Sequence, residues 1–158
     1  MQGIKTLTDS ILENPVFSGL SKSEAEELAS HCEVLVLPPK RKVFGQGEMS
    51  SDIFVLFHGR LLVSVKDLAG VEHNVGHVEQ GEVFGEMGVL ESQTRSASTY
   101  TEQDSIILRI PGTSFTMMVK QGHPAIQRLL QWAITKGCER LRDLDEKLNG
   151  LFDKKQNK

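Results

Sequence analysis

The hydrophobic pattern changes its period twice along the chain. Near the N-terminus, apolar side chains such as Leu7, Ile11 and Leu12 recur three or four residues apart, which predicts short helices. In the middle of the chain, apolar and polar residues alternate in short runs, which predicts β-strands. The helical period then returns. This pattern divides the chain into an N-terminal helical segment (1–32), a β-domain (33–111), C-terminal helices (112–151) and a disordered tail (152–158).

Local signals mark the ends of the first two helices. The first helix should end near Asn14, because the residue before a proline avoids helical backbone angles, and Pro15 follows it. Ser21 should begin the second helix, since Glu24 lies three residues later, as in a capping box. The period changes to strand-like alternation from Glu33 onward.

The predicted strands are short, and turns that contain glycine separate them at nearly regular spacing. The alternating runs cover residues 34–37, 43–45, 53–57, 61–65, 71–78, 98–101 and 106–110. Residues 67–70, Asp-Leu-Ala-Gly, are typical of a hairpin turn. Many short strands of this kind favour an antiparallel β jelly-roll (double-stranded β-helix) barrel. We therefore expect an α+β fold, with the barrel flanked by N-terminal helices and a long C-terminal helix.

The last helix carries a second repeat. His123 and Pro124 should begin it, because proline is tolerated in the first turn of a helix. Apolar or small residues then alternate by four and three positions, at Leu130, Ile134, Gly137, Leu141, Leu144, Leu148 and Leu151. This spacing is that of a coiled-coil seam. The leucines continue beyond the reach of a small barrel, so they predict a homodimer through parallel pairing of this helix. The alternative is that the whole stripe packs on the β-domain.

Composition narrows the classes of function. The chain has 158 residues, of which 39% are hydrophobic, and this suits one domain with a core of its own. A formal net charge of -3 argues against a protein built to coat nucleic acid. Cys32 and Cys138 lie far apart without the spacing of metal ligands. No apolar run is long enough for a signal peptide or a membrane span. We expect a cytoplasmic protein without a membrane or nucleic-acid partner.

The stretch 84–99 combines groups that suit a phosphate. Gly85 precedes a single predicted helical turn, whose first N–H groups have no partner within the helix. Arg95 adds a planar fork of donors, and the hydroxyl of Ser96 adds one more. The carboxylate of Glu86 would repel the same anion, so it should accept hydrogen bonds from hydroxyls beside the phosphate. A phosphate with neighbouring hydroxyls indicates a nucleotide.

This stretch resembles the phosphate-binding cassette of the cyclic nucleotide-binding domain family, of the catabolite activator protein and protein kinase A regulatory subunit type. The family pattern is roughly Phe-Gly-Glu-Leu-(Ala/Gly)-Leu, a short loop, and then Pro-Arg-(Ala/Ser/Thr)-Ala. Residues 84–90 and 94–97 follow it, with Thr94 where many members have proline. Residues 45–48 and 53–59 upstream look like the glycine-bearing strand signatures of the family.

The resemblance implies a non-catalytic receptor in which ligand binding rearranges the C-terminal helices, which serve as lid and dimerisation element for an unknown effector. It assigns the cyclic phosphate to Arg95 and Ser96, and the ribose 2′-hydroxyl to Glu86. Serine rather than threonine follows the arginine, so cAMP is favoured over cGMP. The implied ligand-binding residues are Gly85, Glu86, Met87, Gly88, Arg95, Ser96 and Ala97 in the cassette, and Val63 and Val75 near the base.

Three alternatives belong to other classes. A DNA-binding regulator would need a helix-turn-helix after the long helix, and we expect no room for one after Leu151. A cupin-type metalloprotein would use clustered histidines, and His73 and His77 lie four apart with His58 upstream, although a His-x-His pair is missing. A ligand-free scaffold would keep the fold for dimerisation or docking. No nucleophile set, Walker loop or carboxylate pair points to an enzyme, so we expect neither catalysis nor a bound metal.

Overall fold

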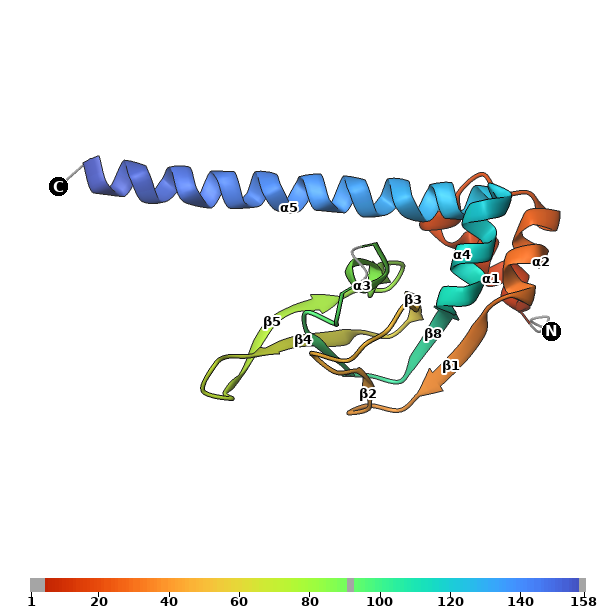
Figure 1. The fold of residues 1–158 in the computed structure, drawn as a ribbon, viewed down its shortest axis with the longest axis horizontal. Coiled ribbons are helices and arrows are strands. Elements are labelled where there is room, and N and C mark those ends of the chain that lie inside the picture. Colours follow the sequence, from red (N-terminus) through yellow and green to blue (C-terminus); the bar gives the residue numbers. More distant parts are fainter. Residues whose placement is uncertain (1–4, 91–92, 157–158) are drawn as a thin grey trace.

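The computed structural model describes residues 5–90 and 93–156, which form a β-sandwich with a long helix lying across it (Figure 1). The helices are α1 (Leu7–Glu13), the 3₁₀ helix η1 (Pro15–Phe17), α2 (Lys22–Ser30), α3 (Glu86–Leu90), α4 (Gly112–Gln121) and α5 (Pro124–Gln156). The strands are β1 (Glu33–Leu37), β2 (Lys42–Phe44), β3 (Ile53–His58), β4 (Leu61–Lys66), β5 (Glu72–Val78), β6 (Val83–Phe84), β7 (Ser98–Thr101) and β8 (Ser105–Ile110).

Two antiparallel sheets of four strands make the sandwich. Their strand orders are β1-β8-β3-β6 and β2-β7-β4-β5, so each sheet pairs strands that lie far apart in the sequence. Three phenylalanine rings meet between the sheets, with centroids 5.2 to 6.0 Å apart, from Phe44, Phe54 and Phe84. The predicted α+β fold, with a jelly-roll between N-terminal helices and a long C-terminal helix, is confirmed.

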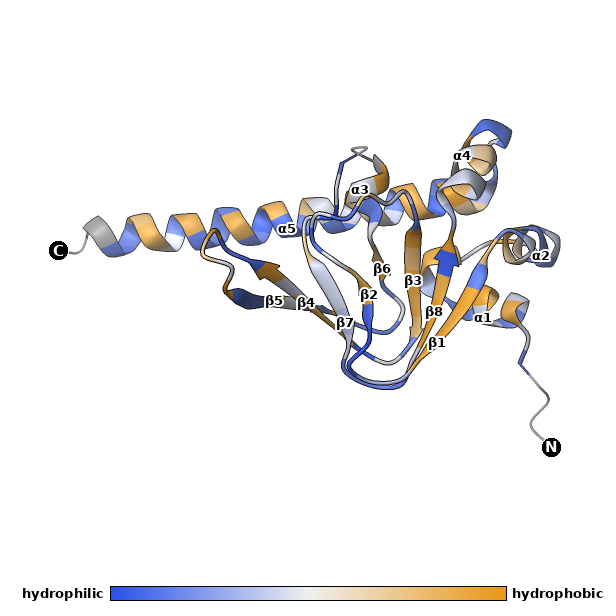
Figure 2. Cartoon of the chain, turned by 60° about the horizontal axis from the view of Figure 1, so that its bottom comes forward, coloured by the Kyte–Doolittle hydropathy of each residue, from blue (hydrophilic) through white to orange (hydrophobic). Residues whose placement is uncertain are grey.

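A helical layer covers the outer face of the β1-β8-β3-β6 sheet. Phe17, Leu28 and Met118 are almost fully buried there, against the sheet residues Val55 and Leu108. The strands beneath this layer are correspondingly apolar, as the orange colour of β1, β3 and β8 shows (Figure 2). The helices thus complete a second core outside the sandwich, and they hold the start of α5 in place.

Side chains cap the helices in this layer. Ser21 and Glu24 form the predicted capping box at the start of α2, because each side chain bonds the backbone N–H of the other residue. At the start of α5, Nδ1 of the buried His123 accepts a hydrogen bond from the N–H of Ala125 at 3.1 Å. The imidazole therefore satisfies one of the donors that the first turn of a helix leaves free.

Helix α5 has two different halves. Near its start, Ala125, Ile126 and Leu129 are buried against η1 and α2. Its second half extends beyond the sandwich, and turns of apolar and polar residues alternate along it (Figures 1 and 2). The seam residues from Ile134 onward are between 50% and 67% exposed, at Ile134, Leu141, Leu144, Leu148 and Leu151. Most of the predicted seam is therefore uncovered in the single chain.

The C-terminal boundary differs from the one that the sequence predicted. We expected the helix to end at 151 and a disordered tail to follow, but α5 continues to Gln156. No proline or glycine lies between 151 and 156, and Lys154 in the last turn suits the negative end of the helix dipole. Residues 157 and 158 lie outside the described part. None of the described helices is both long and apolar enough to span a membrane.

The buried helical layer predicts a large cost for removing one of its leucines. Leu28 is fully buried, so Leu28→Ala should lower the free energy of unfolding by about 2 to 5 kcal/mol. Leu68 lies fully exposed in the β4–β5 turn, so Leu68→Ala is the matched control and should change it by less than about 0.5 kcal/mol. Denaturant unfolding measures both values. Equal effects of the two substitutions would show that α2 does not pack as described.

Candidate binding pocket

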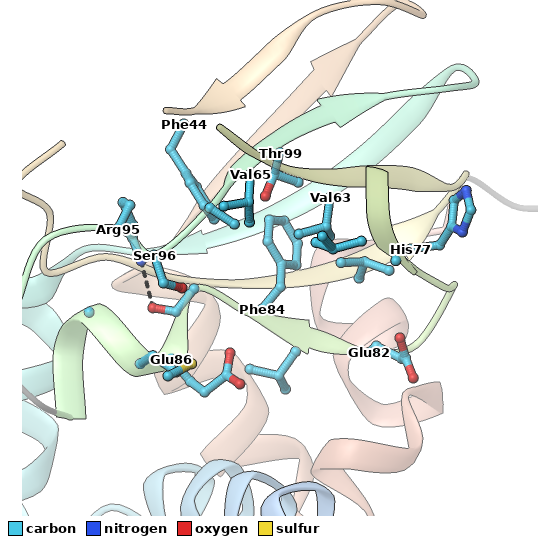
Figure 3. Close-up of a pocket in the computed structure, with 18 of the residues that line it drawn as sticks. Phe44, Val63, Val65, His77, Glu82, Phe84, Glu86, Arg95, Ser96 and Thr99 are labelled. Carbon is cyan, nitrogen blue, oxygen red and sulfur yellow. Dashed lines mark hydrogen bonds between the residues drawn. The ribbon is translucent and has the colours of Figure 1, made fainter. Parts of the chain in front are cut away.

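A cavity of about 460 Å³ opens between strands β4 and β5, the segments 82–88 and 95–97, and helix α5 (Figure 3). All the binding residues that the sequence predicted lie around it, namely Val63, Val75, Gly85, Glu86, Met87, Gly88, Arg95, Ser96 and Ala97. Val63 and Val75 come from neighbouring strands of one sheet, and the others from α3 and the loop around it. The fold therefore brings the two predicted groups together. Their roles toward a ligand stay predictions.

Two glycines let the backbone of the cassette approach the arginine. Gly85 has a φ angle of 76°, which side chains of L-residues disfavour. A Cβ atom at Gly85 would also lie 2.8 Å from Nη1 of Arg95 and 3.1 Å from the ring of Phe54. At Gly88, a Cβ atom would lie 3.2 Å both from Nη1 of Arg95 and from the carbonyl of Ser50. The space that side chains would fill at these positions is taken by the guanidinium of Arg95.

Burial, an aromatic ring and three hydrogen bonds fix the side chain of Arg95 in the pocket. Its residue is only 3% exposed, and its guanidinium lies 4.3 Å above the ring of Phe44. Nη1 donates to the carbonyl of Gly85 at 2.6 Å, while Nη2 donates to Oγ of Ser50 at 2.6 Å and to the carbonyl of Asp52 at 2.7 Å. Nε is buried and has no hydrogen-bond partner among the described residues. The Nε–H donor is thus unused.

The charge of Arg95 is buried without a contacting counter-ion. Within residues 5–90 and 93–156, no carboxylate oxygen forms an ion pair with its guanidinium. Burial lowers the pKa of Arg95, whereas the more distant charges of Asp52, Glu48 and Glu86 act in the opposite direction. An arginine nevertheless stays protonated at neutral pH. A buried positive charge of this kind is costly, and a bound anion would reduce that cost.

Glu86 connects the cassette to the long helix. Its side chain is 14% exposed, and Oε1 lies 3.6 Å from Nη1 of Arg140 on α5. Arg140 also lines the cavity, so the carboxylate and the guanidinium face each other at its rim. Arg140 was not among the residues predicted from the sequence, because it is one of many charged residues on the flank of the seam. Only the three-dimensional course of α5 brings it to Glu86.

The opposite wall of the cavity is mostly apolar. Val63 and Val65 of β4 and Val75 of β5 form it, together with Phe44 and with one hydroxyl, that of Thr99 on β7 (Figure 3). A flat heterocycle suits such a wall, while the polar cassette faces it from the other side. Sequence reasoning missed Thr99, although its place in an alternating strand next to the cassette could have suggested it.

The histidines that suggested a metalloprotein do not come together. Nε2 of His73 lies 2.8 Å from Asp67, and Nε2 of His77 lies 3.4 Å from Glu102. In the described part of the chain, no group of three or more His, Cys, Asp or Glu side chains is arranged to hold a metal ion. His77 is instead one of the residues that line the cavity (Figure 3).

Comparisons with known proteins agree with this geometry. Residues 32–122, more than half of the chain, match the family "Cyclic nucleotide-binding domain". The chain is 25% identical over 146 residues to the cyclic AMP receptor protein of Thermus thermophilus, a match that covers 92% of this chain and 66% of that protein. It is 27% identical over 127 residues to the cAMP-activated global transcriptional regulator of Salmonella typhimurium, which covers 80% of this chain and 59% of that protein. The chain thus spans less than two thirds of these relatives.

The fold of this chain also resembles that of a protein of known structure. The catabolite activator protein of Thermus thermophilus superposes with a TM-score of 0.71 at 24% identity, over 87% of this chain and 62% of that one. At this identity the likeness concerns the fold alone.

The close approach at Gly85 predicts a difference between two glycine substitutions. Gly70→Ala and Gly85→Ala both place alanine at a positive φ angle, which costs about 1 to 2 kcal/mol. No atom lies within 4 Å of the new Cβ at Gly70, whereas the one at Gly85 meets Arg95. Gly85→Ala should therefore lower the free energy of unfolding by about 1 to 3 kcal/mol more than Gly70→Ala. Equal losses in denaturant unfolding would mean that Arg95 does not occupy this position.

Proposed function

The chain belongs to the cyclic nucleotide-binding domain family, and on this premise we propose that it is a non-catalytic receptor that binds cAMP in preference to cGMP. The observation that carries the proposal is the guanidinium of Arg95, which is buried in the wall of a cavity without a counter-ion and with Nε free. A cyclic phosphate is an anion of the kind that would compensate this buried charge. The two relatives named above have cAMP in their names, and both match most of this chain.

The cassette supplies the polar half of the site. The cyclic phosphate accepts a hydrogen bond from Nε of Arg95 and another from the hydroxyl of Ser96, which is exposed at the cavity. Gly85 and Gly88 carry no side chains, so the guanidinium of Arg95 lies directly against the backbone of the cassette. The family associates threonine at the position of Ser96 with guanine, and the serine present here supports the preference for cAMP.

Glu86 connects the ligand to the long helix. Its carboxylate accepts a hydrogen bond from the ribose 2′-hydroxyl, and the same carboxylate faces Arg140 at 3.6 Å. The ligand therefore shares a partner with α5, and it changes the environment of Arg140 when it binds. Such a ligand shifts the position of α5 only by the difference between its affinities for the two arrangements. The proposed output is a rearrangement of α5 that an effector protein recognises.

A ligand-free scaffold is the second candidate. The hydrogen bonds from Arg95 to Gly85, Ser50 and Asp52 stabilise the cassette without any nucleotide, so Arg95 has a structural use as well. The two candidate functions differ in the role of Nε of Arg95. A receptor would use this unpaired donor for the phosphate, whereas a scaffold would leave it unpaired.

We also propose that two copies of the chain pair through the second half of α5. The exposed residues of the seam continue from Leu141 to Leu151 at the spacing of a coiled coil. In a parallel pair in this register, Arg140 of one helix lies near Asp145 of the other, so the flanking charges attract. Burial of the leucines supplies the main driving force.

Removal of the Arg95 side chain should abolish most of the binding. Arg95→Ala should weaken the binding of cAMP by about 2 to 5 kcal/mol, since the buried phosphate loses its charged partner. Arg60→Ala is the matched control, because Arg60 pairs with Glu79 away from the cavity. Isothermal titration of the ligand-stripped proteins measures the affinities, and thermal melting shows whether each variant is folded. Unchanged affinity in folded Arg95→Ala protein would place the ligand elsewhere, and no binding by the natural sequence would favour the scaffold.

Pairing through α5 should depend on the seam and not on the charge of the helix. Leu148→Glu places a carboxylate in the proposed seam and should convert a dimer to a monomer. Asn149→Glu adds the same charge one residue later, on the outer side of the pair, and should leave the dimer intact. Light scattering measures the mass of each protein. A dimer that survives Leu148→Glu would have its interface on another surface.

A further inference from the structure

Three buried hydroxyls lie on strand β7, and one of them differs from the other two. Ser98 is 7% exposed, and both Thr99 and Thr101 are 2% exposed. Oγ of Ser98 accepts a hydrogen bond from the N–H of Gln46 at 2.9 Å. Oγ1 of Thr101 accepts one from the N–H of Arg41 at 2.8 Å and donates to the carbonyl of Pro38 at 2.6 Å. These two hydroxyls therefore join β7 to neighbouring segments of the backbone.

The hydroxyl of Thr99 does not join β7 to another segment of the backbone. Among residues 5–90 and 93–156, no group forms a hydrogen bond with it, while its side chain lines the cavity (Figure 3). Valine has nearly the same shape as threonine, and it would fill this place without burying a polar group. Its oxygen is not one of the fully enclosed atoms without a partner, which in the described part of the chain are Nε of Arg95 and Nε2 of His123. The hydroxyl is therefore accessible from the cavity, where a ligand can supply the partner that the chain does not provide.

The register of the sheet places Thr99 in the apolar wall. It lies opposite Val63 on β4 and opposite Phe44 on β2, and Val63 and Val65 point into the same cavity. Arg95 and Ser96 lie at the start of the segment that leads into β7, and Glu86 lies across the cavity from the wall (Figure 3). In the proposed receptor, the cassette holds the phosphate and ribose, so the group beside Thr99 is the base.

We infer that the hydroxyl of Thr99 forms a hydrogen bond with the base of the bound nucleotide and contributes to the choice between bases. The inference rests on the proposed function. A hydroxyl is both donor and acceptor, so it pairs with a ring nitrogen or an exocyclic group of a purine. Adenine and guanine differ in the donors and acceptors of the six-membered ring. Because Thr99 is fixed on a strand, its hydroxyl meets a different group in each base, and the strength of the contact differs between them. A wall made only of valines would form no such hydrogen bond with either base.

The test compares Thr99→Val and Thr99→Ser with the natural sequence, in titrations of the full chain with cAMP and with cGMP. Thr99→Val should reduce the affinity for cAMP about three- to tenfold, the range of one neutral hydrogen bond, and that for cGMP less than twofold. Thr99→Ser keeps the hydroxyl and should bind cAMP within about twofold of the natural protein. Without ligand, Thr99→Val should melt at nearly the same temperature as the natural protein, because the hydroxyl of Thr99 bonds no group of the described chain.

The outcomes separate this inference from the proposed function. A loss confined to one of the two nucleotides supports a contact with the base. Equal losses place the hydroxyl on the shared ribose phosphate and overturn the inference, as does unchanged binding of both nucleotides by Thr99→Val. In either case the proposed function stands, because the natural protein still binds. Failure of the natural protein to bind either nucleotide overturns the proposed function and this inference with it.

Thr101→Val is the control for a hydroxyl with a structural role. Thr101 is as buried as Thr99, but its hydroxyl bonds the backbone, and it does not line the cavity. Its removal should lower the melting temperature and leave the ratio of the cAMP and cGMP affinities unchanged. The same pattern in Thr99→Val would show that Thr99 has a structural role and would overturn the inference.

Discussion

The buried guanidinium of Arg95 is the constraint around which the pocket is built. Burying a charge is costly, and the structure offsets part of that cost with three hydrogen bonds and the face of Phe44. The backbone joins in, because the N–H of Arg95 donates to the carbonyl of Glu48, and its own carbonyl accepts from the N–H of Gly47. The side chain is thereby fixed before any ligand arrives, and Nε stays free. Because the side chain is already ordered, little conformational entropy is lost when a ligand binds to it.

The cassette and its arginine make two connections to the helices. Its Nη2 donates to the carbonyl of Asp52, whose carboxylate accepts hydrogen bonds from Nε of Arg109 at 2.8 Å and from the N–H of Gly112 at 3.0 Å. Gly112 is the first residue of α4, so this connection leads to the helical layer. The second leads from Glu86 to Arg140 on α5. In the proposed receptor, these contacts would connect a change in the cassette to both C-terminal helices.

Local signals explain why much of the fold was predictable from sequence. Alternation revealed the strands, and Ser21 with Glu24 marked a helix start, because these signals involve residues close together in the chain. The cassette was predictable for the same reason, since Gly85 and Arg95 lie ten residues apart. Arg140 was not, because its meeting with Glu86 depends on the path of a long helix. Thr99 escaped notice because its missing hydrogen bond is visible only when the neighbouring strands are in place.

The measurement that tests the central claim most directly is nuclear magnetic resonance of the arginine Nε–H groups in the isotope-labelled full chain. The Arg95 resonance is identified by its absence from Arg95→Lys protein. If Nε of Arg95 is the donor kept for the phosphate, saturation with cAMP moves this resonance to a higher proton chemical shift, as a new hydrogen bond to a charged oxygen does. Adenosine, which lacks the phosphate, leaves it in place. Bound cAMP with an unchanged Arg95 resonance would contradict the account.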